Sequence, residues 1–142
     1  MKFIQKLIFS SLILGMSGLV YGQTHSFRCS FSDGFSTDFK SNKPSSSRDK
    51  SKFTDLTFDQ LDVKKNRGRM IGNAGATDVG VINGDNSIHI IEQTPSGNMN
   101  ITTIFNPSIK NSSNYPVVHS RHVNIFDEPM TSQYVGLCKK LN

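Results

Sequence analysis

Hydrophobic and polar residues alternate in short runs along most of the chain, and residues typical of turns separate the runs. The alternation is strictest in 25–32, where Phe27, Cys29 and Phe31 occupy one phase and polar residues the other. A period of two is typical of a β-strand with one buried face, because successive side chains of a strand point to opposite faces. After the first 22 residues, no stretch has the 3.6-residue period of an amphipathic helix. The pattern therefore predicts an all-β protein.

Further strands are expected wherever such a run recurs between turn residues. They cover 35–39, 53–63, 70–71, 79–82, 87–93, 99–105, 115–126 and 133–141. Asn83-Gly84 between two hydrophobic runs predicts a β-hairpin, because both residues tolerate a positive φ. By contrast, 41–52 contains Pro44 and three consecutive serines, so we expect an exposed, mobile loop there.

The run 53–63 contains two hydrophobic pairs that are out of phase, because two polar residues separate Phe58 from Leu61. This slip predicts a β-bulge or a break near Asp59-Gln60. In total the pattern gives about eight strands, and the short turns between them favour antiparallel pairing. We therefore expect a single domain over 23–142, folded as an antiparallel β-barrel or β-sandwich.

The amino-terminal segment lacks the alternation and has the three parts of a secretory signal peptide. Lys2 and Lys6 form a positive start, 7–20 is hydrophobic with small residues interspersed, and Val20-Tyr21-Gly22 resembles a cleavage site. A membrane anchor is the alternative, but a span needs about 20 mostly hydrophobic residues and this run is shorter. We therefore predict a signal peptide over 1–22 that is cleaved after Gly22. The mature protein would be periplasmic or secreted and would have no transmembrane segment.

Export also changes the charge balance of the chain. The sequence has 16 Lys and Arg against 11 Asp and Glu, and removal of Lys2 and Lys6 lowers the net charge from +5 to +3. The basic residues that remain are concentrated at Lys40, Lys43, Arg48, Lys50, Lys52, Lys64, Lys65, Arg67 and Arg69. Such a cluster either meets an acidic partner, such as lipopolysaccharide or nucleic acid, or is a solvated surface. Because the overall excess is small and aspartates lie among the basic residues, the composition argues against a nucleic-acid partner.

The chain has two cysteines, Cys29 and Cys138, and they lie near the two ends of the expected mature protein. In an oxidising compartment such a pair predicts a disulfide. A bridge that closes a loop of about 110 residues would stabilise the fold by about 4 to 5 kcal/mol. A redox or metal-binding pair normally has closer spacing, such as C-x-x-C. We therefore expect a structural bridge between the first and last strands.

Candidate catalytic side chains gather in one predicted strand, which holds His119, Arg121 and His122. In a catalytic interpretation, one histidine acts as general base and Arg121 stabilises an anionic transition state. Asp127 or Glu128, which follow closely, would orient the imidazole. In a purely structural interpretation, Arg121 pairs with a carboxylate across the sheet and the histidines are half-buried.

The spacing of these two histidines argues against a metal site. On a strand, His119 and His122 point to opposite faces, and zinc needs a third and a fourth ligand. The glycines in 68–80 fit neither a P-loop nor a dinucleotide-binding pattern. We therefore expect neither a metal ion nor a cofactor.

Two sets of short motifs stand out in the second half of the chain. The first combines 71–75 with 91–98, and the second combines Ser120-Arg121-His122 with the sequence SQYVGLC at 132–138. With these motifs the chain resembles a group of uncharacterised small exported bacterial β proteins over most of its mature length. The resemblance implies a small secreted β fold and brings no known activity or ligand. It singles out Arg121, His122, Gln133 and Tyr134, which we take as candidate binding residues.

Small size, polar loops and the lack of a strong catalytic constellation favour a non-enzymatic binding protein. Its partner would be a protein or a component of the cell envelope, as for an inhibitor or an immunity-like factor. One alternative is a small secreted hydrolase, acting on phosphodiesters or similar bonds through His119 or His122 with Arg121. Another is a surface-assembly subunit, which would need an unpaired, hydrophobic edge strand.

Overall fold

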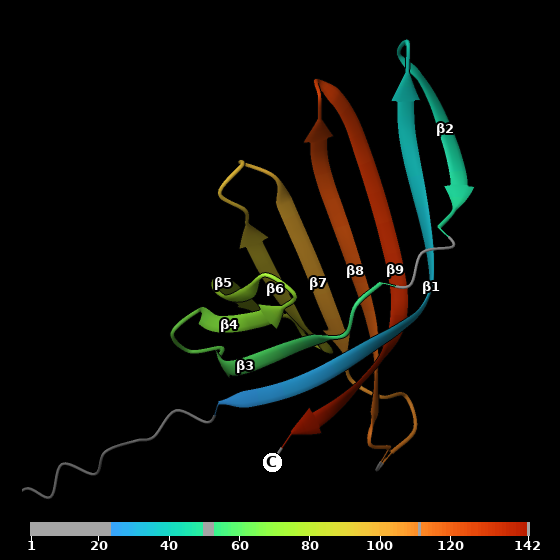
Figure 1. The fold of residues 1–142 in the computed structure, drawn as a ribbon. Helices are drawn as coiled ribbons and strands as arrows, with labels where there is room; N and C mark the ends of the chain where they lie inside the picture. The colour runs from blue at the N-terminus through green and yellow to red at the C-terminus, as the bar shows by residue number, and fades with distance from the viewer. Residues whose placement is uncertain (1–23, 50–52, 111, 142) are drawn as a thin grey trace, which may run out of the picture.

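The computed structural model describes residues 24–49, 53–110 and 112–141, and within them it contains nine β-strands and no helix (Figure 1). The strands are β1 His25–Lys40, β2 Lys43–Arg48, β3 Leu56–Asp62, β4 Arg67–Gly72, β5 Gly75–Asn83, β6 Ser87–Gln93, β7 Met99–Phe105, β8 Asn114–Ile125 and β9 Glu128–Leu141. The all-β prediction is thus confirmed. The signal peptide predicted over 1–22 lies outside the described residues.

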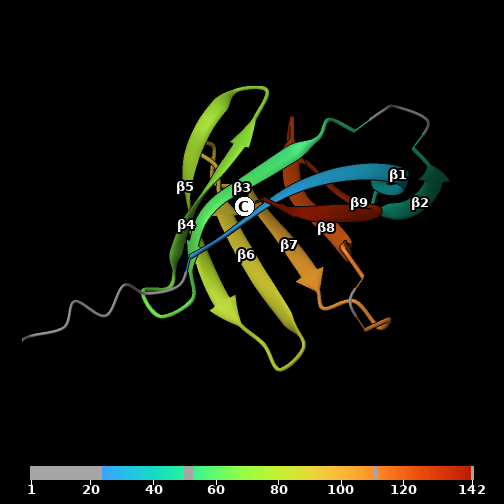
Figure 2. The same cartoon turned by 90° about the horizontal axis from the view of Figure 1, so that it is seen from below.

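The strands form one antiparallel sheet in the order β2-β1-β3-β4-β5-β6-β7-β8-β9, and β1 also pairs with β9. This additional pairing closes a barrel of eight strands, and β2 is an extra strand beside β1. Seen from below, β1 and β9 run side by side along the seam of the barrel (Figure 2). Of the two architectures expected from the sequence, the barrel is therefore correct.

A disulfide joins Cys29 of β1 to Cys138 of β9, as predicted. The two residues face each other in the β1–β9 ladder, and both side chains are completely buried. The bridge therefore fastens the seam where the first strand of the barrel meets the last. A disulfide of this kind is compatible with an extracytoplasmic protein. Within the described ranges, no helix has the length and apolar character needed to cross a membrane.

Hydrophobic side chains from most of the strands fill the barrel interior. The buried members of this core are Phe27, Cys29, Leu56, Phe58, Leu61, Val79, Val81, Ile90, Ile104, Val117 and Cys138. They come from the inward phase of the alternation, so the period of two in the sequence is the period of burial in the fold. Tyr115 packs edge-on against Phe27, with ring centroids 5.2 Å apart.

The prediction of a loop over 41–52 was wrong for its central part, because Lys43–Arg48 is the strand β2. β1 is 16 residues long, and its distal half, from Phe35 onward, pairs with β2 on one side and β9 on the other. Ser41 and Asn42 turn the chain back with positive φ values of 50° and 61°. All the residues of β2 are exposed, so this strand has no buried face that would give it a hydrophobic alternation. A polar strand of this kind suits a solvent-exposed sheet edge.

Two local predictions about turns can be compared with the backbone. The register of β3 shifts between Asp59 and Asp62, and Gln60 has a φ of 51°, so the predicted bulge is confirmed. The hairpin at Asn83-Gly84 is also present, between β5 and β6. Neither residue of the turn has a positive φ, so the predicted reason for the glycine does not apply. A Cβ on Gly84 would lie 2.7 Å from Ser87 Oγ and 3.0 Å from His89 Nε2, so these two side chains would have to shift to admit a larger residue.

Candidate functional site

A cavity lies at the end of the barrel where the β4–β5 and β6–β7 hairpins turn. Its volume is about 510 Å³, which is within the range of small-molecule sites. The β1–β2 and β8–β9 hairpins extend beyond this end and form a taller wall on one side (Figure 1). The lining residues are Phe53, Thr54, Leu56, Met70, 72–77, Glu92, Pro95, Asn100, His119 and Arg121. We call this space the mouth cavity.

The strand registers bring polar side chains into one row at the mouth. Glu92 of β6 is opposite Asn100 of β7. Asn100 is in turn opposite Arg121 of β8, which is opposite Ser132 of β9. Because residues directly opposite each other in an antiparallel ladder point to the same face, the four side chains are all directed inward. We call these four residues the polar row.

Polarity decreases from the mouth towards the core. The next inward-facing row consists of Ile90, Thr102, His119 and Tyr134. The row below it consists of Ile88, Ile104, Val117 and Gly136. The cavity therefore has a polar rim on these strands and an increasingly hydrophobic depth.

His119 is held in its neutral form inside the barrel. Its side chain is 2% exposed, and its Nδ1 forms a hydrogen bond with the Thr102 hydroxyl at 2.7 Å. Burial lowers the pKa of His119 to about 4, and the nearby positive charge of Arg121 contributes to the same effect. The imidazole is therefore uncharged at neutral pH.

The Phe53 ring forms the wall of the cavity next to His119, and the Tyr134 ring packs against it. The Phe53 ring stacks on Tyr134 with centroids 4.2 Å apart, and it lies 5.0 Å from the His119 ring. The Tyr134 hydroxyl donates a hydrogen bond of 2.6 Å to Asp49. Burial raises the pKa of Tyr134, and the hydrogen bond to Asp49 raises it further. Gly34 makes room for the Tyr134 ring, because a Cβ there would lie 2.4 Å from Cδ1 of the tyrosine.

Arg121 has no counterion in the part of the chain that the structure describes. Its side chain is half-buried and lines the mouth cavity. Three of the exposed arginines are paired: Arg28 with Asp55 at 3.8 Å, Arg48 with Asp33, and Arg69 with Asp59 at 2.8 Å. No ion pair or hydrogen bond joins Arg121 to another described residue. The expected pairing of Arg121 with a carboxylate across the sheet was therefore wrong.

Glu92 and Asn100 bind each other within the polar row. The Asn100 side-chain amide donates a hydrogen bond to Glu92 Oε2. The Asn100 Oδ1 atom is buried, and no described residue donates a hydrogen bond to it. The row thus contains both a cation without a counterion and an acceptor without a donor.

The structure separates the candidate binding residues between the two surfaces of the barrel. Arg121 and Tyr134 point into it, whereas His122 and Gln133 are exposed on the outside. The Gln133 side-chain amide donates a hydrogen bond of 3.2 Å to Ser120 Oγ. His122, Gln133 and Phe35 border a smaller outer hollow of about 270 Å³. As predicted for a strand, His119 and His122 point to opposite faces.

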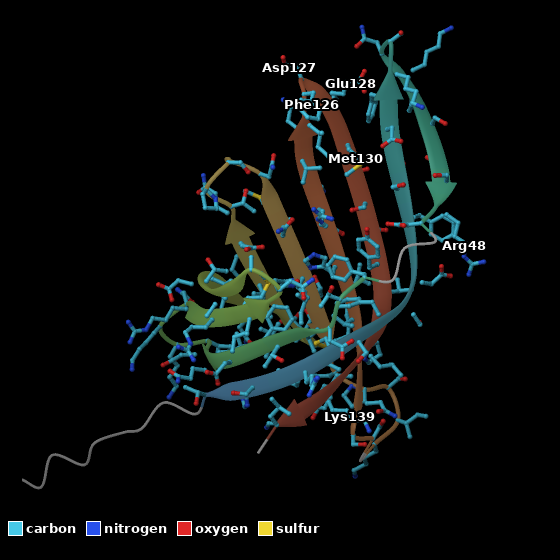
Figure 3. All side chains as sticks on the ribbon, viewed as in Figure 1. Arg48, Phe126, Asp127, Glu128, Met130 and Lys139 are labelled. Atoms are coloured by element: carbon cyan, nitrogen blue, oxygen red, sulfur yellow. A yellow bond between two sulfur atoms is a disulfide. The ribbon has the colours of Figure 1, made fainter. Side chains whose placement is uncertain are left out.

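Neither candidate catalytic histidine is oriented by a carboxylate in the described residues. His119 has the Thr102 hydroxyl as its partner, and no hydrogen bond to an acidic group is present for His122. Asp127 and Glu128 lie at the far tip of the β8–β9 hairpin (Figure 3). The general-base arrangement considered for this segment is therefore not assembled.

A third histidine, which the sequence did not single out, lies on the outer surface. His89 forms hydrogen bonds with Ser87 Oγ at 3.1 Å and Thr103 Oγ1 at 3.0 Å. Both ring nitrogens are thus hydrogen-bonded to hydroxyl groups, and His89 lines none of the cavities found in the described residues. We interpret this cluster as support for the β5–β6 turn.

Several residues of the mouth cavity were missed by sequence reasoning, namely Phe53, Met70, Glu92 and Asn100. A signal for two of them was available in the alternation. In 87–93 the inward phase reads Ile88, Ile90, Glu92, and in 99–105 it reads Ile104, Thr102, Asn100. A hydrophobic phase that ends in a polar residue at the same end of two paired strands predicts a polar opening.

No group of three or more His, Cys, Asp or Glu side chains that could hold a metal ion is present within residues 24–49, 53–110 and 112–141. Comparison of the chain with protein-family models, with curated proteins and with solved structures found no match.

Proposed function

We propose that the protein is an exported, non-enzymatic binding protein and that its ligand occupies the mouth cavity. The observation that carries this proposal is the half-buried, unpaired Arg121 at the rim of a cavity with an aromatic wall. Ligand sites are typically concave, mostly hydrophobic, and equipped with a few polar groups that fix orientation. The mouth cavity has this composition.

The proposed compartment follows from the predicted signal peptide over 1–22 and agrees with the Cys29–Cys138 bridge. In that setting the ligand would be a component of the cell envelope. A protein partner, as for an inhibitor or an immunity-like factor, would have to insert a protruding group into the cavity. The dimensions of the cavity favour a small molecule or such a group over a flat protein surface.

Binding is better supported than hydrolysis because the site lacks a suitable base. A general base works best when its pKa is near the operating pH, whereas the pKa of His119 is about 4. The Nδ1 atom of His119 is also occupied by Thr102. A secreted hydrolase would thus have to use His122 on the outer surface, where no described carboxylate assists it.

A surface-assembly role receives less support from the edges of the sheet. Within the described strands, the barrel is closed, and β2 pairs on one side only. β2 has the sequence KPSSSR. A polar edge strand that contains a proline opposes pairing with another chain.

Fluorescence of anilinonaphthalene sulfonate (ANS) tests the proposed function. Thr77 lines the mouth cavity, so a Thr77→Trp change would fill it with an indole ring. Gln93 is exposed at the end of β6, where it borders a separate outer hollow, so Gln93→Trp adds the same group outside the mouth cavity. We expect saturable ANS binding by the wild type and Q93W and its loss in T77W.

Far-ultraviolet circular dichroism and urea unfolding of all three proteins would establish that each is folded. If folded T77W binds ANS as tightly as the wild type, the mouth cavity is not the binding site and the proposal is wrong.

A further inference from the structure

The charge balance of the mouth cavity depends on one cation and one anion. Among the described lining residues, Arg121 is the only Lys or Arg, and Glu92 is the only Asp or Glu. Glu92 accepts the hydrogen bond from Asn100, and it lies two strands away from Arg121. Neighbouring strands are about 4.8 Å apart. Glu92 on β6 and Arg121 on β8 are therefore separated by two such spacings, with Asn100 on β7 between them. The Arg121 guanidinium is therefore available to a ligand.

The chemistry of a guanidinium selects the group it binds. Arginine presents several N–H donors in a planar fork that matches a carboxylate in two parallel hydrogen bonds. A doubly charged phosphate would need a further cation, and the described lining contains Glu92 instead. His119 adds no positive charge, because its imidazole is neutral at pH 7. A singly charged carboxylate fits this environment best.

The remainder of the lining fits a hydrophobic group. Phe53, Leu56 and Met70 contribute apolar side chains, and the stacking on Tyr134 holds the Phe53 ring in place. The rim on the β4–β5 side is made of small residues, Gly72, Ala74, Gly75 and Ala76. At Gly75, nothing lies within 4 Å of an added Cβ, so this side of the rim is open to solvent.

We infer that the ligand is an amphipathic monocarboxylate, whose carboxylate binds Arg121 and whose hydrophobic body lies against Phe53, Leu56 and Met70. This inference rests on the proposed function, because it names the ligand class for the same cavity. Arg121 is then the residue that determines specificity. The aromatic wall contributes affinity that does not depend on the charge of the ligand.

Isothermal titration with three probes of equal chain length tests the inference: decanoate, decanol and decylamine. The wild type is expected to bind decanoate most tightly. Arg121→Gln should weaken decanoate binding by about tenfold to a hundredfold, the range for hydrogen bonds to charged groups. The affinity for decanol should be the same in both proteins. Arg121→Lys retains the charge but not the planar fork, so its affinity for decanoate should lie between those of the wild type and R121Q.

Arg67→Gln provides the matched control. Arg67 is exposed on β4, outside the mouth cavity, and forms no ion pair with a described residue. The substitution removes the same charge from the protein without changing the cavity. We expect R67Q to bind decanoate like the wild type, which would show that net charge alone does not explain the loss in R121Q.

If the probes bind, two results would overturn the inference. One is equal decanoate affinity in the wild type and R121Q, and the other is wild-type binding of decanol or decylamine at least as tight as that of decanoate. If no probe binds while ANS binding is lost in T77W, the carboxylate assignment is wrong and the mouth cavity remains the binding site. If T77W also leaves ANS binding unchanged, the proposed function itself is wrong.

Discussion

Acid should destabilise the barrel through His119, because this imidazole is buried in its neutral form. Its pKa in the folded protein is about 4, mainly because of burial and also because of the charge of Arg121. In the unfolded chain the ring is solvated and its pKa returns to about 6.5. Between these two values the unfolded state binds a proton that the folded state does not bind. The free energy of unfolding therefore falls as the pH falls through this window.

The size of the effect follows from the gap between the two pKa values, 6.5 and about 4. That gap corresponds to about 3 kcal/mol of unfolding free energy. The contribution of neutral His119 is complete above pH 6.5 and is lost by about pH 4. Since small domains are stable by only about 5 to 15 kcal/mol, this loss should be easy to measure.

Urea unfolding at several pH values between 7 and 4, with His119→Gln as the comparison, measures this contribution. Glutamine is neutral at every pH and keeps a polar group near Thr102. We expect the wild type to lose about 3 kcal/mol more than H119Q over this range. Other titrating groups, such as His25 with its lowered pKa and the paired aspartates, are present in both proteins and cancel in the difference. Parallel curves for the wild type and H119Q would refute the reasoning.

Two further predictions concern the seam between β1 and β9. Replacement of both cysteines by serine should lower the free energy of unfolding by about 4 to 5 kcal/mol, because the bridge closes a loop with a sequence separation of 109. Guanidinium unfolding measures this loss. A loss below about 1 kcal/mol would contradict the explanation by loop-closure entropy in the unfolded chain. Gly136→Ala should prevent stable closure, because a Cβ would lie 2.0 Å from the Ser30 carbonyl oxygen and the two strands would have to separate. Gly80→Ala is the matched control, since the closest contact of its Cβ would be an ordinary 3.8 Å to the Ile91 carbonyl oxygen. In thermal unfolding, the melting temperature of G80A should be near that of the wild type. Equal melting temperatures for G136A and G80A would refute the steric argument.

Much of the fold could be predicted because burial follows the hydrophobic alternation. Phe27 and Cys29, in one phase of 25–32, are both buried in the barrel, and the phase slip at Asp59-Gln60 is a real bulge. β2 could not be found in this way. Its residues are all exposed, and it exists because the distal half of β1 extends beyond the barrel and offers a free edge. Pairing of that kind depends on the length of a neighbouring strand and not on the local sequence.

The candidate site was predicted only in part, for a related reason. Selecting Arg121 and His122 together contradicts the alternation, because adjacent residues of a strand point to opposite faces. The structure accordingly directs Arg121 inward and His122 outward. Glu92 and Asn100 were missed because each lies among other polar residues of a short strand. Only the register of β6, β7 and β8 brings them beside Arg121.

Barrel closure does not require the polarity of the mouth, and this polarity lowers stability. Asn100 Oδ1 is buried without a donor among the described residues, and an unsatisfied group of this kind costs about 1 to 3 kcal/mol. Two rows deeper, the inward-facing residues of β6, β7 and β8 are hydrophobic, so no polar group is left there without a hydrogen-bond partner. In sequences that fold well, a buried polar group without a partner is found mainly at functional positions. The polar row contains such a group, and the hydrophobic rows below it do not. Glu92 lies two strands away from Arg121 and does not pair with it. Instead Glu92 binds Asn100, and the guanidinium of Arg121 is left to face the cavity.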